Sequence, residues 1–170
     1  VSGINALMDE HSSVILTQDW HPAGHSSFAS SHEGKGPYEP TEMPYGPQLL
    51  WPDHCVIGSH GAAFHPDLRT DATQMIVRKR FRPHNDSYSA FSENDRSTAT
   101  GLHGYLQERG IRSLVLTGLA TDFCVAYSAL DAARLGYAVE LHESLCRAID
   151  LDGSLAAAKS QLRAAGVKIS

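Results

Sequence analysis

The chain has 170 residues, 42% of them hydrophobic and 19% charged, a composition typical of globular domains and not of disordered or fibrous proteins. Fourteen Lys and Arg against nineteen Asp and Glu give a net charge of −5, so nucleic acid, which demands a basic surface, is not an expected partner. No apolar run approaches the roughly 20 residues that span a bilayer, and three cysteines cannot form a disulfide framework. We therefore expect a cytoplasmic protein that binds neither nucleic acid nor membranes.

Short apolar runs rich in β-branched residues predict buried strands at 13–17, 74–77, 113–117 and 137–141. Apolar residues at helical spacing predict helices at 97–109, 121–135 and 155–165, each followed by a glycine, whereas 1–9 reads as the end of a helix and 167–169 as a last strand. Strands that alternate with helices predict an α/β fold with a parallel sheet, organised as one domain over residues 1–170.

Residues 18–70 show neither helix nor strand periodicity, although they contain seven of the eight prolines and six of the ten histidines. Long loops without regular structure are uncommon inside domains and are usually functional. This segment follows the strand at 13–17, and ligands of open α/β sheets bind beyond the carboxyl ends of the strands. A binding site is therefore expected here.

Asp19 and His21 follow the first predicted strand, and because residues two apart in an extended segment project to the same side, both side chains can reach one ion. With His54 they make a two-histidine, one-carboxylate set that suits Zn²⁺, Mn²⁺ or Fe²⁺. His25 is a candidate fourth ligand or a supporting group. The alternative is an ordinary turn with surface imidazoles.

Cys124 lies in the turn that joins the strand at 113–117 to the helix at 121–135, where Gly118 allows a sharp bend and Thr121 is a candidate N-cap. A thiol in the first helical turn faces the positive end of the helix dipole, which favours the thiolate, and nearby N–H groups can receive an oxyanion. The alternative is a buried structural cysteine.

Lys79 follows the strand at 74–77, so that it also lies at a carboxyl end of the predicted sheet. A cation there can support a nucleophilic cysteine, whereas a lone lysine is otherwise a solvated surface charge. A candidate metal site, a candidate nucleophile and a lysine thus follow the ends of three predicted strands. A cysteine amidohydrolase with an auxiliary metal needs these three components.

Five segments carry a resemblance to a known family: TQDWHP at 17–22, WPDHC at 51–55, VRK at 77–79, DSYSAF at 86–91 and GLATDFCV at 118–125. Together, and in this order, they resemble the nicotinamidases (pyrazinamidases) of the isochorismatase-like hydrolase superfamily. The resemblance implies a three-layer α/β/α fold with a central, mainly parallel sheet. It also implies conversion of nicotinamide to nicotinate and ammonia, in NAD salvage, with pyrazinamide as a further substrate, and it leaves a homo-oligomer open.

The resemblance also implies roles for individual residues. Cys124 would be the nucleophile and Lys79 the lysine of the catalytic triad, while the N–H groups of Ala120 and Cys124 would form an oxyanion hole shaped by a cis peptide at Leu119–Ala120. One divalent metal, zinc first and Mn or Fe as alternatives, would be held by Asp19, His21 and His54, with His25 open as a further ligand. The substrate pocket would be lined by Trp51 and Tyr88, with Phe28 nearby.

Two departures from the family pattern stand out. The family's catalytic Asp lies in a V-D-x-Q-N-D-F segment on a first strand that has no counterpart here, so we expect this chain to be N-terminally truncated. Arg80 stands where the family usually has Gly, and its side chain either crowds the turn or adds a second cation. Three readings therefore stay open: a cysteine amidohydrolase acting on nicotinamide or another small amide, a metal-water hydrolase in which Cys124 is a bystander, and a non-catalytic metal- or ligand-binding domain.

Overall fold

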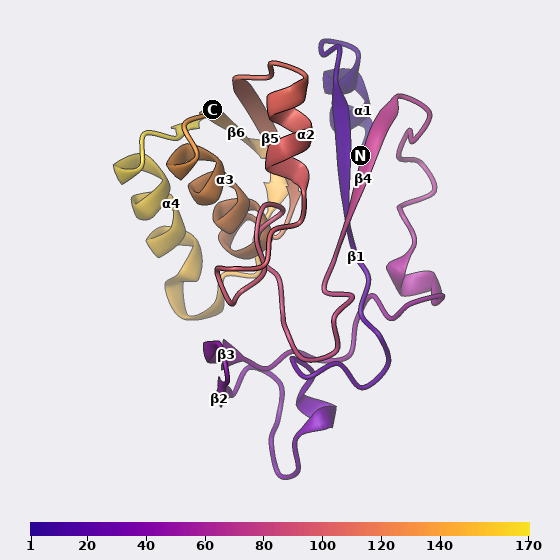
Figure 1. Ribbon diagram of the computed structural model, residues 1–170, viewed down its shortest axis with the longest axis vertical. Coiled ribbons are helices and arrows are strands. Elements are labelled where there is room, and N and C mark those ends of the chain that lie inside the picture. Colours follow the sequence, from indigo (N-terminus) through magenta and orange to yellow (C-terminus); the bar gives the residue numbers. More distant parts are fainter.

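The computed structural model describes residues 1–170 and divides the main strands between two parallel sheets that lie side by side (Figure 1). One sheet pairs β1 (Val14–Asp19) with β4 (Thr73–Lys79), and the other has the order β5 (Ser113–Leu119), β6 (Ala138–Arg147), β7 (Lys168–Ile169). A separate antiparallel hairpin joins β2 (Pro40–Met43) to β3 (Gly46–Leu49).

Four α-helices accompany these strands: α1 (Ser2–Met8), α2 (Leu102–Glu108), α3 (Ala126–Arg134) and α4 (Ser154–Ala164). Short helical turns are η1 (Ala29–Ser31), η2 (His60–Ala62), η3 (Thr121–Val125, π-helical) and η4 (Leu151–Gly153). The α3 and α4 helices lie together beside the β5–β6–β7 sheet (Figure 1). None of the helices combines the length and apolarity that crossing a bilayer requires.

The hydrophobic core lies mainly between the three-stranded sheet and its helices. Leu106, Ala129, Leu141 and Leu162 are at most 1% exposed and belong to one buried cluster. Val77 of β4 joins the same cluster, so the two sheets share a core although no backbone hydrogen bonds pair them. Burial of apolar side chains is the main force that holds the two sheets together.

The α/β class and the predicted strands are confirmed, and the differences lie in the boundaries and in the sheet. The central sheet is two sheets, because β1 pairs only with β4 and β5 only with β6. The helix predicted at 97–109 begins at Leu102, and the strand predicted at 137–141 continues to Arg147. The segment 18–70, expected to lack strands, contains the β2–β3 hairpin.

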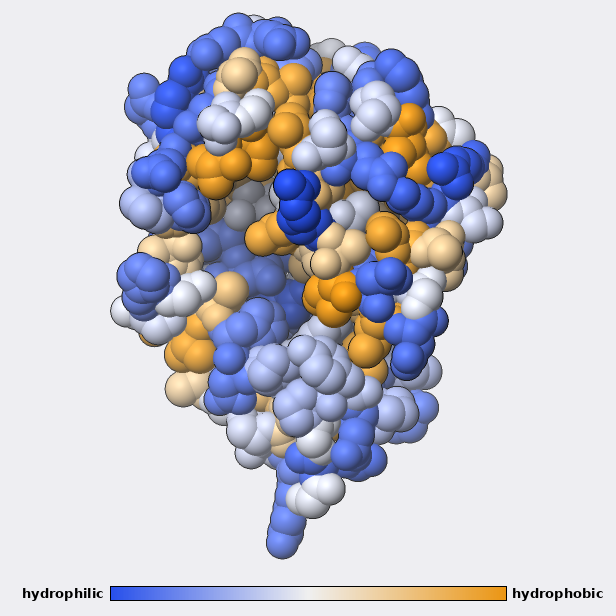
Figure 2. All heavy atoms as spheres, turned by 180° about the vertical axis from the view of Figure 1, so that it is seen from behind, coloured by the Kyte–Doolittle hydropathy of each residue, from blue (hydrophilic) through white to orange (hydrophobic).

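Apolar side chains remain exposed on this divided sheet. Ile76 of β4 is 45% exposed, and Val115 and Leu119 of β5 are 36% and 72% exposed. Figure 2 shows the rear of the molecule, where apolar residues gather in patches around a recess with hydrophilic walls.

Strand ends position the site. In the β1–β4 pair, Asp19 lies directly opposite Lys79, the last residue of each strand, and β5 ends at Leu119 just before η3. Asp19 and Lys79 therefore end two parallel strands and Cys124 follows the end of a third, as predicted, whereas the histidine and aromatic candidates come from loops.

Candidate active site

Lys79 and Asp19 form a buried ion pair in which Nζ of the lysine lies 2.9 Å from Oδ1 of the carboxylate. The same Nζ donates to the backbone carbonyls of Ser87 (3.3 Å) and Tyr88 (3.1 Å). Burial alone would lower the pKa of Lys79, but Asp19 and the sulfur of Cys124 outweigh it, and that pKa lies above its ordinary value. Burial would likewise raise the pKa of Asp19, yet Arg80 and Lys79 outweigh it and hold that pKa well below its usual range. Both groups are therefore charged at neutral pH.

Cys124 lies in η3, the π-helical turn between β5 and α3, as the strand–turn–helix pattern predicted. Its Sγ accepts a hydrogen bond of 3.2 Å from Nη2 of Arg80, and its carbonyl accepts one from Oγ of Ser128 at 2.6 Å. The prediction of Thr121 as the N-cap is wrong: Ala120 precedes the turn, and no side chain caps it. Since β5 arrives in an extended conformation and turns at once into η3, the thiol stands at a sharp bend, a setting typical of nucleophiles.

A cis peptide bond joins Leu119 to Ala120, as the family resemblance implied. The carbonyl of Ala120 accepts hydrogen bonds from the N–H groups of Phe123 and Val125, whereas its own N–H donates to no backbone carbonyl. An unpaired N–H next to the nucleophile is the type of donor that an oxyanion requires.

Aromatic side chains gather around Phe123, the residue that precedes the nucleophile. Trp51 and Tyr88 are each 6% exposed, and Nε1 of Trp51 donates to the hydroxyl of Tyr88 at 3.0 Å. Phe123, which the sequence reasoning overlooked, packs edge-on against Trp51 with ring centroids 4.8 Å apart and also contacts Tyr88. Phe123 immediately precedes Cys124 in the sequence, and this proximity could have identified it as a residue of the site. Such a wall suits a flat aromatic ring.

Phe28 occupies a different environment from Trp51 and Tyr88. It is fully buried, and its ring centroid lies 4.8 Å from that of His21 and 5.7 Å from that of His54. Its ring therefore packs against the rings of two predicted metal ligands, His21 and His54.

The histidines predicted as metal ligands do gather in one place. The ring centroid of His21 lies 4.5 Å from that of His54 and 4.9 Å from that of His25. Burial, followed by the charge of Arg80, lowers the pKa of His21 to about 2, and the same two causes lower the pKa of His54. Burial also lowers the pKa of His25. Neutral imidazoles are the form in which histidine binds metals.

Whether these residues fit a divalent ion can be tested on the polar atoms themselves. In favour of a cation, Nδ1 of His21 and Nε2 of His25 are buried without a hydrogen-bond partner. Against it, the two carboxylate oxygens of Asp19 face Lys79 and Arg80, and Nε2 of His21 lies 3.4 Å from Nη1 of Arg80. No group of three or more His, Cys, Asp or Glu side chains is arranged to hold a metal ion. In this arrangement the donor set does not fit a divalent metal.

A second carboxylate, Asp86, is fully buried next to the site. Its Oδ1 lies 3.4 Å from Nη1 of Arg80, and its Oδ2 accepts from Nε2 of Gln48 at 2.8 Å. Gln48 belongs to β3, so the hairpin within the long loop is tied to the centre of the site. In the sequence, this carboxylate belongs to the segment DSYSAF at 86–91, which contributed to the family resemblance but gave Asp86 no role.

Asp122 is a further residue that the sequence reasoning left without a role. Its carboxylate is buried beside Cys124 and accepts hydrogen bonds from the N–H groups of Ile149 and Asp150 and from Oγ of Ser154. It therefore joins the turn that carries the nucleophile to the start of α4. Only the tertiary fold brings these partners together.

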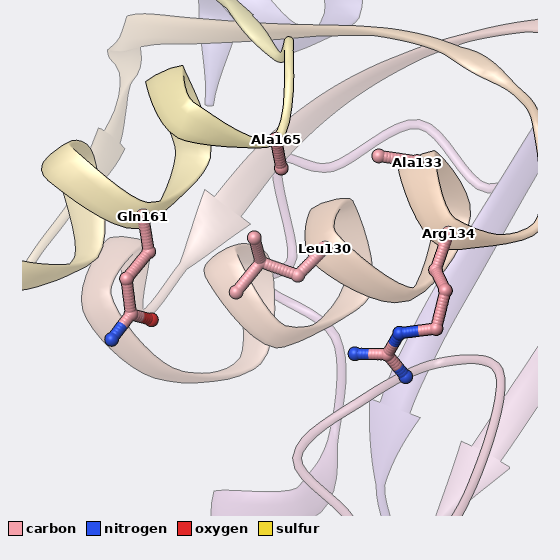
Figure 3. Close-up of a pocket in the computed structure, with 5 residues that line it drawn as sticks. All are labelled: Leu130, Ala133, Arg134, Gln161 and Ala165. Atoms are coloured by element: carbon pink, nitrogen blue, oxygen red, sulfur yellow. The ribbon is translucent and has the colours of Figure 1, made fainter.

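A shallow pocket on the surface is separate from this site. Leu130, Ala133 and Arg134 of α3 line it together with Gln161 and Ala165 from α4 and its C-terminal end (Figure 3). The only charged group in it is Arg134, which is paired with Asp131 at 2.9 Å. The residues that line this pocket include no nucleophile, general base or set of metal ligands.

Comparison with known proteins decides the family. The sequence model of a protein family, the isochorismatase domain, matches residues 5–170 of this chain. The chain belongs to the isochorismatase family. A curated nicotinamidase from Acinetobacter baylyi is 50% identical to this isochorismatase-family chain over 97% of the chain and 77% of the relative. The nicotinamidase of Escherichia coli is 46% identical over 81% of the chain, which spans 64% of that relative. The resemblance stated from the sequence motifs is thereby confirmed.

Solved structures of relatives show the same fold as this isochorismatase-family chain. A nicotinamidase/pyrazinamidase from Acinetobacter baumanii superposes with a TM-score of 0.98 at 51% identity, covering 99% of this chain and 82% of that one. PnC1 from L. infantum, in complex with nicotinate, superposes with a TM-score of 0.84 at 38% identity, covering 99% and 77%. A pyrazinamidase of Pyrococcus horikoshii, in complex with zinc, superposes with a TM-score of 0.77 at 28% identity, covering 100% and 83%.

Proposed function

We propose that this chain is a nicotinamidase, a cysteine amidohydrolase that converts nicotinamide to nicotinate and ammonia, with pyrazinamide as a further substrate. The observation that carries the proposal is the position of Cys124 at the bend after β5, close to the Lys79–Asp19 pair at the ends of β4 and β1. The curated relative that is 50% identical is itself a nicotinamidase.

The chemistry follows from the position of the thiol. The Cys124 thiol gives up its proton to solvent, the sulfur attacks the carboxamide carbon, and the negative charge moves to the amide oxygen. The N–H groups of Ala120 and Cys124 stabilise that oxyanion. Collapse of this intermediate breaks the C–N bond, and the nitrogen takes up a proton and leaves as ammonia. Water then attacks the thioester, which releases the carboxylate and restores the thiol.

The residues around the thiol orient the substrate. Trp51 and Tyr88, with Phe123, offer aromatic edges and faces to a pyridine or pyrazine ring, while Lys79 supplies a buried positive charge beside the reacting atoms. Phe28 acts indirectly, by supporting the rings of His21 and His54.

The family resemblance implies a divalent metal, zinc first, at Asp19, His21 and His54, with His25 beside them, and the zinc complex of the Pyrococcus horikoshii relative is in line with it. In this chain Lys79 and Arg80 face the same donor atoms, so we propose that these residues bind such a metal only weakly. No step above depends on the metal. We further propose a cytoplasmic protein that acts in NAD salvage on a small-molecule substrate.

One observation favours a second candidate. The polar partner of Sγ is Arg80, and no carboxylate lies within hydrogen-bond distance of that sulfur to accept its proton. A general base typically contributes a factor of about 10²–10⁴ to the rate. The second candidate is therefore a protein that binds nicotinamide without turning it over.

The test measures ammonia release and nicotinate formation from nicotinamide by the unmodified chain, by Cys124→Ala and by the matched control Cys146→Ala. Cys146 belongs to the hydrophobic core, and its Sγ donates to the carbonyl of His142. The nicotinamidase proposal expects activity in the unmodified chain and in the control, and none in Cys124→Ala. Activity retained by Cys124→Ala but lost in His54→Ala would instead identify a metal-water hydrolase. Stoichiometric binding of nicotinamide by calorimetry without any turnover would favour the second candidate.

A further inference from the structure

Arg80 is the most unusual residue of the site. It directly follows β4, its backbone is in the left-handed region with φ at +66°, and it is 3% exposed. Residues other than glycine seldom adopt this conformation, and it persists only where surrounding contacts hold it. At this position the left-handed turn directs a long cationic side chain into the centre of the site.

The guanidinium of Arg80 contacts polar groups from several segments at this centre. Its Nε lies 3.3 Å from Oδ2 of Asp19 and donates to the carbonyl of Ser87 at 3.1 Å. Its Nη1 lies 3.4 Å from Oδ1 of Asp86 and 3.4 Å from Nε2 of His21. Its Nη2 donates to Sγ of Cys124 at 3.2 Å. One planar group thus connects two carboxylates, a histidine and the nucleophile.

These contacts coincide with the predicted metal site. At the predicted site, zinc would bind a carboxylate oxygen and imidazole nitrogens at about 2.0–2.2 Å. Arg80 instead contacts Oδ2 of Asp19 and Nε2 of His21. A guanidinium does not lose its proton in proteins, so a metal ion there would meet a permanent positive charge at close range.

We propose that Arg80 is a built-in cation of this site, which competes with a divalent metal for Asp19 and His21 and thereby weakens metal binding. The inference deepens the proposed function at the same site. Its test measures metal binding and needs no turnover of nicotinamide. A failure of the Arg80 proposal therefore does not decide the proposed function, and a failure of the proposed function does not decide the Arg80 proposal.

The test measures Zn²⁺ binding to the full chain by competition with a chromophoric chelator and by calorimetry, for the unmodified protein, Arg80→Gly and Arg96→Gly. Arg96 is the matched control because it also has a left-handed backbone, with φ at +61°, and an ion pair, in this case between its exposed side chain and the buried Asp131. We expect Arg80→Gly to bind one Zn²⁺ at least tenfold more tightly than the unmodified chain, and Arg96→Gly to match the unmodified chain.

Two further variants locate the effect and its cause. Adding His54→Ala to Arg80→Gly should remove the gain, and Arg80→Lys, which keeps the positive charge, should stay close to the unmodified chain. Equal affinities of the unmodified chain and Arg80→Gly, a gain that survives loss of His54, or an Arg80→Lys variant as tight as Arg80→Gly would each overturn the proposal. Should Arg80→Gly not fold, tight one-to-one binding by the unmodified chain that His54→Ala abolishes would overturn it equally.

Discussion

Replacing Asp122 by Asn tests how the turn that carries Cys124 is held in place. The Asp122 carboxylate, 4% exposed, accepts hydrogen bonds from the N–H of Ile149 (3.1 Å), the N–H of Asp150 (2.8 Å) and Oγ of Ser154 (2.5 Å). Burial raises the pKa of Asp122, but these hydrogen bonds outweigh it and leave that pKa below its ordinary value. At neutral pH an anion therefore accepts all three bonds.

The magnitude follows from the number of bonds that an amide cannot keep. A hydrogen bond to a charged group contributes about 1.5–3 kcal/mol. Oδ1 of Asp122 accepts from Ile149, and Oδ2 accepts from Asp150 and Ser154. The amide oxygen of Asn can keep the two bonds at Oδ2, but its NH₂ then faces the N–H of Ile149, so at least one bond should be lost. This reduces the free energy of unfolding by about 1.5–3 kcal/mol. With a denaturant slope of about 1–3 kcal/mol per molar urea, the midpoint should fall by at least roughly 0.5 M.

Urea unfolding followed by tryptophan fluorescence at pH 7 measures this loss. The control is Asp152→Asn in η4, because the side chain of Asp152 is exposed and it lies in the same segment. We expect the control to unfold within about 0.5 kcal/mol of the unmodified chain, as surface substitutions usually do. A midpoint for Asp122→Asn that equals that of the control would refute the anchoring role derived from these distances.

Three further predictions concern the core, the aromatic wall and pH. Leu162→Ala, at a fully buried position, should lower the free energy of unfolding by about 2–5 kcal/mol in the same assay, and a loss below 1 kcal/mol would contradict the burial. Tyr88→Phe removes the acceptor of Trp51 Nε1 and Gln48 Nε2, so it should cost about 1–3 kcal/mol and raise KM for nicotinamide, whereas an unchanged urea midpoint would count against these bonds. Because the pKa of His21 is lowered to about 2 in the fold, the unfolded chain binds the extra proton below about pH 6.5. The free energy of unfolding should thus fall from pH 7 to pH 5 by up to about 1.4 kcal/mol per unit, and a chelator-treated His21→Gln with an equally steep fall would exclude this origin.

The sequence was sufficient to predict the strands and the place where their ends meet. The apolar runs located β1, β4 and β5, and Asp19 and Lys79 were each expected at the carboxyl end of a strand, where the structure has them. Their 2.9 Å ion pair was not predicted, because Asp19 was expected to bind a metal and Lys79 to support Cys124. The nucleophile turn followed from the same reasoning, since a glycine-containing strand end leads directly into a helical pattern at Cys124.

Other features were beyond the sequence because they depend on tertiary contacts. The second half of β6 contains His142, Glu143 and Ser144, whose polar character hides a strand that pairing with β5 extends. The β2–β3 hairpin was concealed by its prolines. For Arg80 the sequence left two outcomes open, a crowded turn or a second cation, and the left-handed backbone selects the second.

The alternation of charges around Arg80 has a consequence for how molecules reach the site. Lys79 and Arg80 supply two positive charges, and Asp19 and Asp86 supply two negative ones within direct contact, so the buried cluster is electrically balanced. A balanced cluster projects little field into solvent, and a neutral amide would not be steered by charge in any case. Capture of such a ligand should therefore vary little with ionic strength, leaving the shape of the aromatic wall, and not long-range attraction, to select what enters.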